Sequence, residues 1–241
     1  MVKIILNILG CFPLMVLLSA CSSTDEHKLF NGKTLEGWEG SDTFFRVDQG
    51  AIVGGSLKKP VDKSYYLCTK KTYENFELKL EAKFKTSYLK INGGISFRAK
   101  RVPNSNEVMG YQADIGYIDA NALALFSDIT PADTTGIYPL WGSLVDENRP
   151  DTSRYPKPEV FPVIFYTVAN MELVERTIEP EGWNEVYIKA IGPDLEIKIN
   201  GVSTAKFTEQ ENVPSKGCIC LQTHAGEPYE VYYKNIVLNQ P

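Results

Sequence analysis

Apolar and polar residues alternate with a period of two along most of this chain. In residues 76–85 apolar side chains at every second position are separated by lysine and glutamate, and residues 183–190 and 194–200 show the same alternation. A period of two puts successive side chains on opposite faces of a β-strand, one buried and one in water. Because no stretch shows a sustained period of 3.6, the pattern predicts an all-β protein.

Turn residues divide the rest of the chain into further short strands. Asn200-Gly201 indicates a hairpin, because a tight two-residue turn requires positive φ. Other strands are predicted at residues 44–47, 51–54, 65–69, 94–98, 111–115, 161–169, 204–207, 217–223 and 230–238. Ten or more such strands predict a two-sheet sandwich of the jelly-roll type. Residues 128–157 lack alternation and are expected to form a long irregular insertion, a class of loop that is often functional.

The first twenty residues have the composition of an export signal. Lys3 precedes an apolar run from Ile4 to Leu18, and small residues come before Cys21. The run is too short to be a membrane-spanning helix. Cys21 lies where the sequence resembles a bacterial lipoprotein box, with an ordinary signal peptide as the alternative. We therefore expect a signal peptide at 1–20, a lipidated Cys21 and tether at 21–27, and one sandwich domain at 28–241, exported and lipid-anchored on the periplasmic or cell-surface side of the outer membrane.

Charge and cysteine content limit the partners and the covalent framework. The formal net charge of −5 argues against nucleic acid as a partner. After the signal and Cys21, three cysteines remain, at positions 68, 218 and 220, and an odd number cannot form a closed disulfide framework. Cys218 and Cys220 are poorly placed to bridge each other along one strand. Buried thiols are expected, with one pairing to Cys68 as the alternative.

Three predicted strands differ from the others in their polar faces. Where other strands carry lysine and glutamate, these carry short hydrogen-bonding side chains: Ser96 and Arg98, then Gln112 and Asp114, then Cys218, Cys220, Gln222 and His224. Long charged side chains coat faces that meet water, whereas short polar ones suit a groove. We infer that the three strands belong to one sheet and that their polar faces line a cleft. The alternative is three surface strands with few charges.

Several site chemistries can be weighed from residue types. A Ser–His–acid triad would have to use His224, because His27 lies in the tether, and no Gly-x-Ser-x-Gly string is present. Cys218, Cys220 and His224 would extend about 20 Å along a strand, too far for one zinc ion. No cofactor is indicated with certainty, although a divalent cation held by Asp and Asn oxygens of residues 128–157 stays open.

A conventional glycosidase would need two carboxylates on either side of the bond that it cleaves. Asp114 could be paired with Asp146 or with Glu147. The Glu-x-Asp-x-x-Glu string that sandwich glucanases carry on one strand is absent, which argues against this reading.

A family resemblance runs through these same residues. Residues 29–38, Leu-Phe-Asn-Gly-Lys-Thr-Leu-Glu-Gly-Trp, resemble the opening of the 3-keto-disaccharide hydrolase family, once called DUF1080. Further matches follow in the family's order at residues 92–98, 110–116, 141–149, 182–184, 200–201, 221–224 and 233–236. Two departures are a longer loop before Trp141 and a valine at position 145 in place of the usual tyrosine; both bear on the substrate more than on the fold.

The resemblance implies a concanavalin A-like sandwich and a sugar hydrolase with distinctive chemistry. A partner oxidoreductase would supply a glycoside with a ketone at C3, which makes the C2 proton acidic. The enzyme would remove that proton, eliminate the C1 substituent and add water. Such a site needs a base, a donor for the enolate and an acid. We assign Asp114 or His224 as base, Arg98 or Arg149 as enolate stabiliser, Glu147 as acid, Gln112 and Gln222 as hydroxyl binders, and Trp141 as a stacking platform.

Other interpretations of the same residues remain. Arg98 and Asp114 could form a structural ion pair, and Trp141 could anchor its loop to the core. At the level of the protein, the alternatives are a non-catalytic carbohydrate-binding surface lipoprotein and a conventional glycosidase that uses the same cleft.

Overall fold

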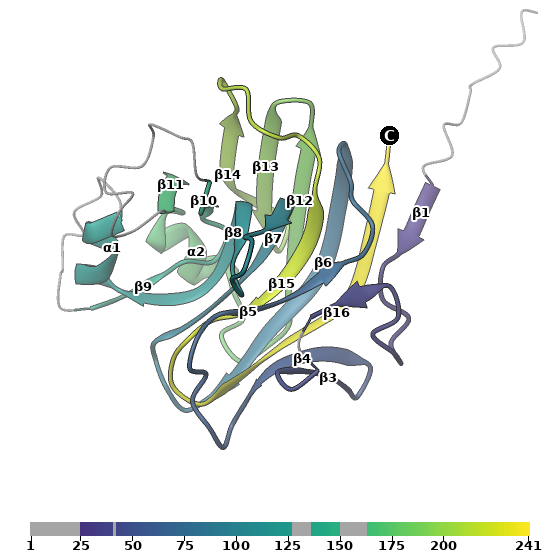
Figure 1. The fold of residues 1–241 in the computed structure, drawn as a ribbon. Coiled ribbons are helices and arrows are strands. Elements are labelled where there is room, and N and C mark those ends of the chain that lie inside the picture. The colour runs from purple at the N-terminus through teal and green to yellow at the C-terminus, as the bar shows by residue number, and fades with distance from the viewer. Residues whose placement is uncertain (1–24, 41, 127–135, 150–162) are drawn as a thin grey trace, which may run out of the picture.

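A computed structural model describes residues 25–40, 42–126, 136–149 and 163–241. Two antiparallel sheets pack face to face in the described chain (Figure 1), which confirms the predicted all-β sandwich. The expected signal peptide and Cys21 lie outside the described residues. Within the described ranges, no helix has the length and apolar character needed to span a bilayer.

Within the described residues each sheet contains eight strands, and their order brings distant parts of the sequence together. The first sheet has the order β14 (Val202–Thr208), β13 (Asp194–Ile199), β12 (Asn184–Ile191), β6 (Phe76–Thr86), β16 (Tyr229–Gln240), β4 (Ala51–Ser56) and β3 (Phe45–Asp48), with β1 (Asp25–Lys28) paired to β16. The second sheet has the order β11 (Val163–Thr167), β10 (Leu144–Glu147), β8 (Val108–Asp119), β7 (Ile91–Arg101), β15 (Cys218–Thr223), β5 (Tyr65–Thr69) and β2 (Trp38–Glu39), with β9 (Ile137–Pro139) paired to β8.

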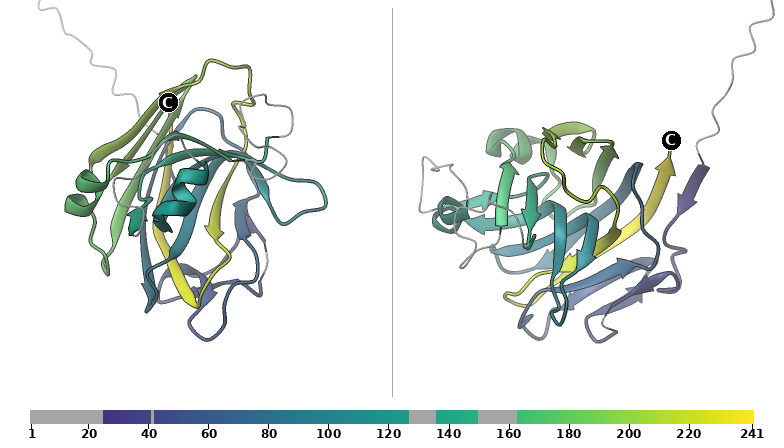
Figure 2. Two further views of the ribbon diagram at one scale, coloured as in Figure 1. Left: turned by 90° about the vertical axis from the view of Figure 1, so that its left-hand side faces the viewer. Right: turned by 45° about the horizontal axis from the view of Figure 1, so that its top comes forward.

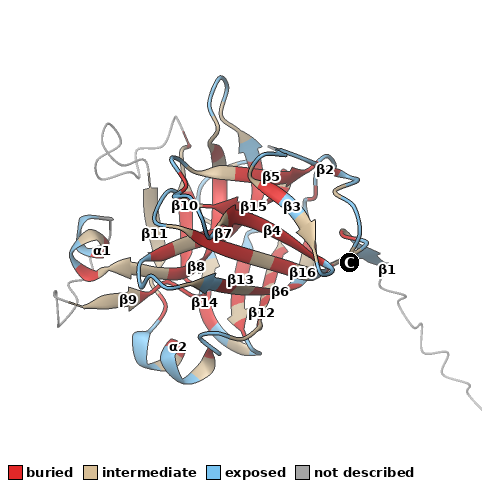
Figure 3. Cartoon of the chain, turned by 90° about the horizontal axis from the view of Figure 1, so that it is seen from below, coloured by how far each residue is buried: buried red, intermediate tan, exposed pale blue. Residues whose placement is uncertain are grey.

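The core lies between the sheets and is built from the apolar half of each alternating strand. On β6, Leu78 and Leu80 are fully buried, while Lys79 between them is exposed. On the second sheet, Ile95 and Ala113 are paired across β7 and β8 and are fully buried as well. Figure 3 shows these buried stretches along the middle of both sheets. The period of two therefore predicted the inward faces correctly.

Two short helices were missed, because seven residues make too few turns to show a helical period. Along the chain, α1 (Ala120–Phe126) directly follows β8, and α2 (Met171–Thr177) comes after β11 and before β12. Both helices are seen in Figure 2. Asn170 caps α2 by accepting a hydrogen bond from the Leu173 backbone N–H at 2.9 Å.

Two other expectations need correction. The insertion expected to be irregular contains β9 and β10, and β10 pairs with β8 on one side and β11 on the other. The tether expected at residues 21–27 overlaps β1, because residues 25–28 pair with the second half of β16.

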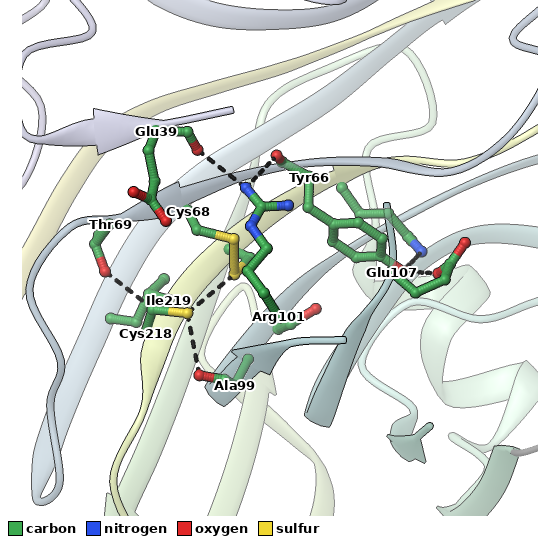
Figure 4. Close-up of a disulfide and its surroundings, with 12 residues drawn as sticks. Glu39, Tyr66, Cys68, Thr69, Ala99, Arg101, Glu107, Cys218 and Ile219 are labelled. Atoms are coloured by element: carbon green, nitrogen blue, oxygen red, sulfur yellow. Dashed lines mark hydrogen bonds between the residues drawn. A yellow bond between two sulfur atoms is a disulfide. The ribbon is translucent and has the colours of Figure 1, made fainter. Parts of the chain in front are cut away.

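A disulfide connects β5 to β15 on the outer face of the second sheet. Cys68 and Cys220 lie directly opposite each other in the ladder and are bonded (Figure 4), so the pairing with Cys68 is confirmed. Cys218 keeps a free thiol, whose Sγ lies 3.4 Å from that of Cys220.

The disulfide predicts a large loss of stability when it is removed. It joins residues 152 positions apart, and a loop of that length stabilises the folded state by roughly 4–5 kcal/mol through the lost entropy of the unfolded chain. We expect the Cys68→Ala/Cys220→Ala protein to melt about 10 °C lower than the wild type in calorimetry without reductant. Cys218→Ala is the matched control and should melt within about 2 °C of the wild type. Equal melting of the double variant and the control would contradict the disulfide.

Candidate active site

A hydrogen-bond network crosses the outer face of the second sheet, and Gln112 on β8 is at its centre. The Gln112 Nε2 group lies 2.7 Å from Asp114 Oδ1 and 3.3 Å from Glu147 Oε1. Its Oε1 atom accepts a hydrogen bond from Ser96 Oγ at 2.7 Å. One amide group therefore contacts two carboxyl groups and is itself oriented by a hydroxyl from the neighbouring strand.

The network continues across the neighbouring strands, on the same outer face, through Gln222 on β15. Gln222 Oε1 lies 3.3 Å from Gln112 Nε2, and Gln222 Nε2 donates to the Tyr66 hydroxyl at 2.7 Å. The Tyr66 hydroxyl lies 3.3 Å from Glu147 Oε2 and 3.2 Å from Glu107 Oε2. The participating strands β5, β15, β7, β8 and β10 are consecutive neighbours, as the three-strand cleft hypothesis required.

Gly94 on β7 makes space for the central amide. It lies opposite Asp114 in the ladder. A Cβ atom at position 94 would lie 2.4 Å from Gln112 Cδ and 2.7 Å from Nε2. Because such contacts are far inside van der Waals distance, only glycine lets the amide lie flat over β7 and reach both carboxyl groups.

Burial raises the pKa of both carboxyl groups into the neutral range. For Asp114 the pKa is raised to about 7, because the group is removed from water, although the hydrogen bond from Gln112 opposes the shift. For Glu147 the pKa is raised to about 8 by burial first, and then by the negative charges of Asp114 and Glu107. Near neutral pH the pair therefore favours one ionised and one protonated group.

The carboxyl pair opens into a cavity of about 640 Å³. Asp114, Glu147 and His224 all line this cavity, together with Asn92 at the start of β7. The His224 Nδ1 atom lies 2.8 Å from the Ala225 carbonyl oxygen. Asn92 Oδ1 is buried and has no hydrogen-bond partner in the described part of the chain. An unused acceptor at this place can receive a hydrogen bond from a polar ligand.

Arg98 does not lie in the cleft, contrary to the sequence-based assignment. The β7–β8 ladder runs from Phe97 opposite Tyr111 to Lys100 opposite Met109, so β7 carries one extra residue. Arg98 takes positive φ at this bulge. Its guanidinium donates to the backbone oxygens of Glu74 at 3.0 Å and Gly192 at 2.8 Å. Ala99 replaces it on the outer face, where it packs against Tyr66 and the cysteines. The Arg98–Asp114 ion pair is therefore not formed.

Arg149 and Trp141 also lie away from the cleft. Arg149 Nε is 2.5 Å from Asp146 Oδ1, and its guanidinium lies 4.5 Å from the centre of the Tyr111 ring, on the inward side of the sheet. Because Asp146 faces inward, Glu147 and not Asp146 is the partner of Asp114. Trp141 is buried in the core, with its ring edge-on to Phe84, and this bears out the structural alternative for Trp141.

Sequence reasoning missed Tyr66, Glu107 and Asn92 as members or neighbours of the site. Tyr66 lies in the run Tyr-Tyr-Leu-Cys-Thr, which reads as an apolar strand. The signal that could have found it is that β5 and β15 carry cysteines in register, since this places Tyr66 opposite Gln222. Figure 4 shows Tyr66 reaching Glu107 beside the disulfide.

Comparisons with known proteins agree with this architecture. The family described as "3-keto-alpha-glucoside-1,2-lyase-like domain" matches residues 25–239. No protein with a curated description matches the chain. Among solved structures, a candidate glycosyl hydrolase from Parabacteroides distasonis is similar, with a TM-score of 0.57, 19% identity, and coverage of 90% of this chain and 94% of that one.

The same sandwich also occurs in carbohydrate-binding proteins. The carbohydrate-binding module CBM66 from Bacillus subtilis has a TM-score of 0.56 and 11% identity, over 85% of this chain and 96% of that one. The carbohydrate-recognition domain of Emp47p has a TM-score of 0.56 and 10% identity, over 86% and 90%. At these identities the likeness establishes the jelly-roll fold alone.

The raised pKa of Asp114 predicts how stability depends on pH. Well below pH 4 the carboxyl group is protonated in both the folded and the unfolded chain, and at pH 4 the difference between the two states is still small. As pH rises toward the folded pKa of about 7, the unfolded state gains the free energy of ionisation in water and the folded state loses stability. We expect Asp114→Asn to melt close to the wild type at pH 4 and several degrees higher at pH 9.

Asp194→Asn, at an exposed position on β13, is the control for this comparison. Its melting temperature should follow that of the wild type at every pH. A constant difference between Asp114→Asn and wild type from pH 4 to pH 9 would show that the Asp114 carboxyl is not held in a buried, raised-pKa state.

Proposed function

Because the chain belongs to the family of 3-keto-alpha-glucoside-1,2-lyase-like domains, we propose that it cleaves glycosides whose sugar carries a ketone at C3. The observation that supports this most is the pair Asp114 and Glu147, which contact the same Gln112 amide and open into one cavity. Elimination next to a ketone needs a base and an acid in a single site, and this pair supplies both near neutral pH.

We assign the base to Asp114 and the acid to Glu147. The short hydrogen bond from Gln112 favours the ionised form of Asp114, and the charge of Asp114 in turn raises the pKa of Glu147 and keeps it protonated. Gln112 holds the two side chains in place, and Ser96 and Gln222 hold Gln112.

The reaction proceeds in two halves. In the first, ionised Asp114 takes the C2 proton, the C2–H electron pair forms the enolate, and the C1–O bond breaks as Glu147 gives its proton to the departing oxygen. In the second, water adds to C1 of the unsaturated ketone while Glu147 takes a proton from the water and Asp114 returns its proton to C2. Both carboxyl groups end as they began, and the net change is hydrolysis of the glycosidic bond.

The enolate oxygen needs a hydrogen-bond donor. Arg98 and Arg149 cannot supply it, because both lie away from the cavity. Tyr117, Lys90, Asn92 and His224 also line the cavity and can donate hydrogen bonds. Because Lys90 is paired with Asp119, we assign this role and the binding of the sugar hydroxyls to His224 and Asn92. The hydroxyl-binding role expected of Gln112 and Gln222 is replaced by positioning, because both amides are buried within the network.

The cellular setting is part of the same proposal. The ketone must come from an oxidoreductase that oxidises the 3-hydroxyl of a glycoside, and residues 1–21 support an exported, lipid-anchored protein that meets such substrates outside the cytoplasm.

Substrate choice tests the function directly. We expect the purified domain to cleave 3-keto-glucosides and to leave the matching unoxidised glucosides intact, because only the ketone acidifies C2. Asp114→Asn should lower kcat by at least about a hundredfold, whereas Asp194→Asn should keep the wild-type rate. Cleavage of unoxidised glucosides would instead indicate a conventional glycosidase, and binding without product would indicate a carbohydrate-binding module.

The pH dependence of kcat/KM tests the assignment of acid and base. Activity should rise as Asp114 loses its proton near pH 7 and fall as Glu147 loses its proton near pH 8, giving a narrow bell whose limbs belong to the coupled pair. Glu147→Gln should remove the alkaline limb and slow the release of poor leaving groups most. A profile that is flat between pH 6 and pH 9 would exclude this pair as the proton-transfer groups.

A further inference from the structure

The cavity has two chemically different ends, and the carboxyl pair lies between them. Asn92 and His224 belong to the polar end, where β7 begins and β15 ends. The other end is formed by Val163 and Phe165 on β11 and by Ala122 on α1, a helix that contacts β11. These three residues, here called the apolar wall, are only half-buried although all are apolar.

The ladder places the apolar wall beside the acid. Glu147 lies directly opposite Val163, and Val145 lies directly opposite Phe165. Residues paired across an antiparallel ladder project from the same face, so the β11 side chains and the Glu147 carboxyl share the cleft face. α1 follows β8 directly, and Ala122 closes the same end of the cavity. Whatever leaves with a proton from Glu147 therefore departs along the apolar wall.

The charged residues that the structure describes around the cavity disfavour an anionic leaving group. Besides the catalytic pair, Asp119 and Glu227 also line the cavity, against one lysine, Lys90. Lys90 Nζ lies 2.7 Å from Asp119 Oδ2, so its charge is already matched on the rim. A carboxylate or phosphate in the cavity would meet the negative charges of Asp114 and Glu227, while Lys90 is already paired.

We propose that the apolar wall is a subsite for an uncharged, apolar leaving group, an aromatic aglycone rather than a second sugar; this rests on the proposed function. A second sugar would bring several hydroxyl groups against side chains that can neither donate nor accept a hydrogen bond, and each hydroxyl would lose its water without replacement. An aromatic ring loses no hydrogen bonds there and can pack on Phe165.

The test uses leaving groups of matched chemical reactivity. Benzyl alcohol and methanol have similar acidities, so the rates for benzyl and methyl 3-keto-glucosides differ mainly through contacts of the aglycone. We expect the wild-type kcat/KM for the benzyl compound to exceed that for the methyl compound by about tenfold or more, and a 3-keto-disaccharide to be no better than the methyl compound.

Two variants change the apolar wall in opposite ways. Phe165→Ser removes the packing surface and should reduce the benzyl preference to less than about threefold, with the methyl rate kept. Ala122→Trp fills the subsite and should suppress the benzyl compound while it spares the methyl compound. Leu125→Ser, an exposed residue of α1 outside the cavity, is the control and should keep the full preference. Melting temperatures of all three verify folding.

The outcomes separate this subsite from the proposed function. Turnover with equal rates for benzyl and methyl compounds, or a benzyl preference that survives both variants, overturns the subsite and leaves the function intact. Failure to cleave any 3-keto-glucoside overturns the function. In that case calorimetric affinities for benzyl and methyl glucoside decide the subsite, and equal affinities reject it.

Discussion

One buried amide in contact with two carboxyl groups is the constraint on which the rest of the site depends. Gln112 Nε2 holds Asp114 and Glu147 within reach of one another, and this contact is formed only because five consecutive strands present their outer faces side by side. Ser96 and Gln222 fix the orientation of the amide. Gly94 leaves the space that it occupies. The residues on the outer faces of those strands therefore together fix the position of the Gln112 side chain.

Such a site works against the stability of the fold. Two carboxyl groups held away from water near each other raise the free energy of the folded state once either ionises. The covalent bond between Cys68 and Cys220 lies in the same outer-face cluster as Tyr66, and it ties together β5 and β15, the strands that carry Tyr66 and Gln222. The disulfide contributes stability that offsets the cost of the buried acids, a balance typical of sites selected for function.

Sequence periodicity predicted the part of the site that regular strands carry. Gln112 and Asp114 share a face because nothing interrupts the alternation between them, and Ser96 and Gln222 follow the same rule. The prediction for Arg98 was wrong because one extra residue in β7 reverses the faces beyond Phe97. A β-bulge cannot be recognised from the pattern of apolar and polar residues alone. Trp141 and Arg149 lie in a segment without alternation, so the pattern could not decide between a cleft position and the core position that was the alternative for Trp141. The apolar wall could not be predicted from the sequence, because it depends on which strand pairs with β10.

The position of β1 has a consequence for the outer edge of the first sheet. β4 pairs with β16 only over residues 229–233, and β1 takes the place beside residues 237–240. Without those four N-terminal residues, the end of β16 would present free N–H and C=O groups to any passing strand. The segment that joins the domain to whatever precedes it thus also shields the sheet from self-association, and a chain shortened past Lys28 would lose solubility before it loses its fold.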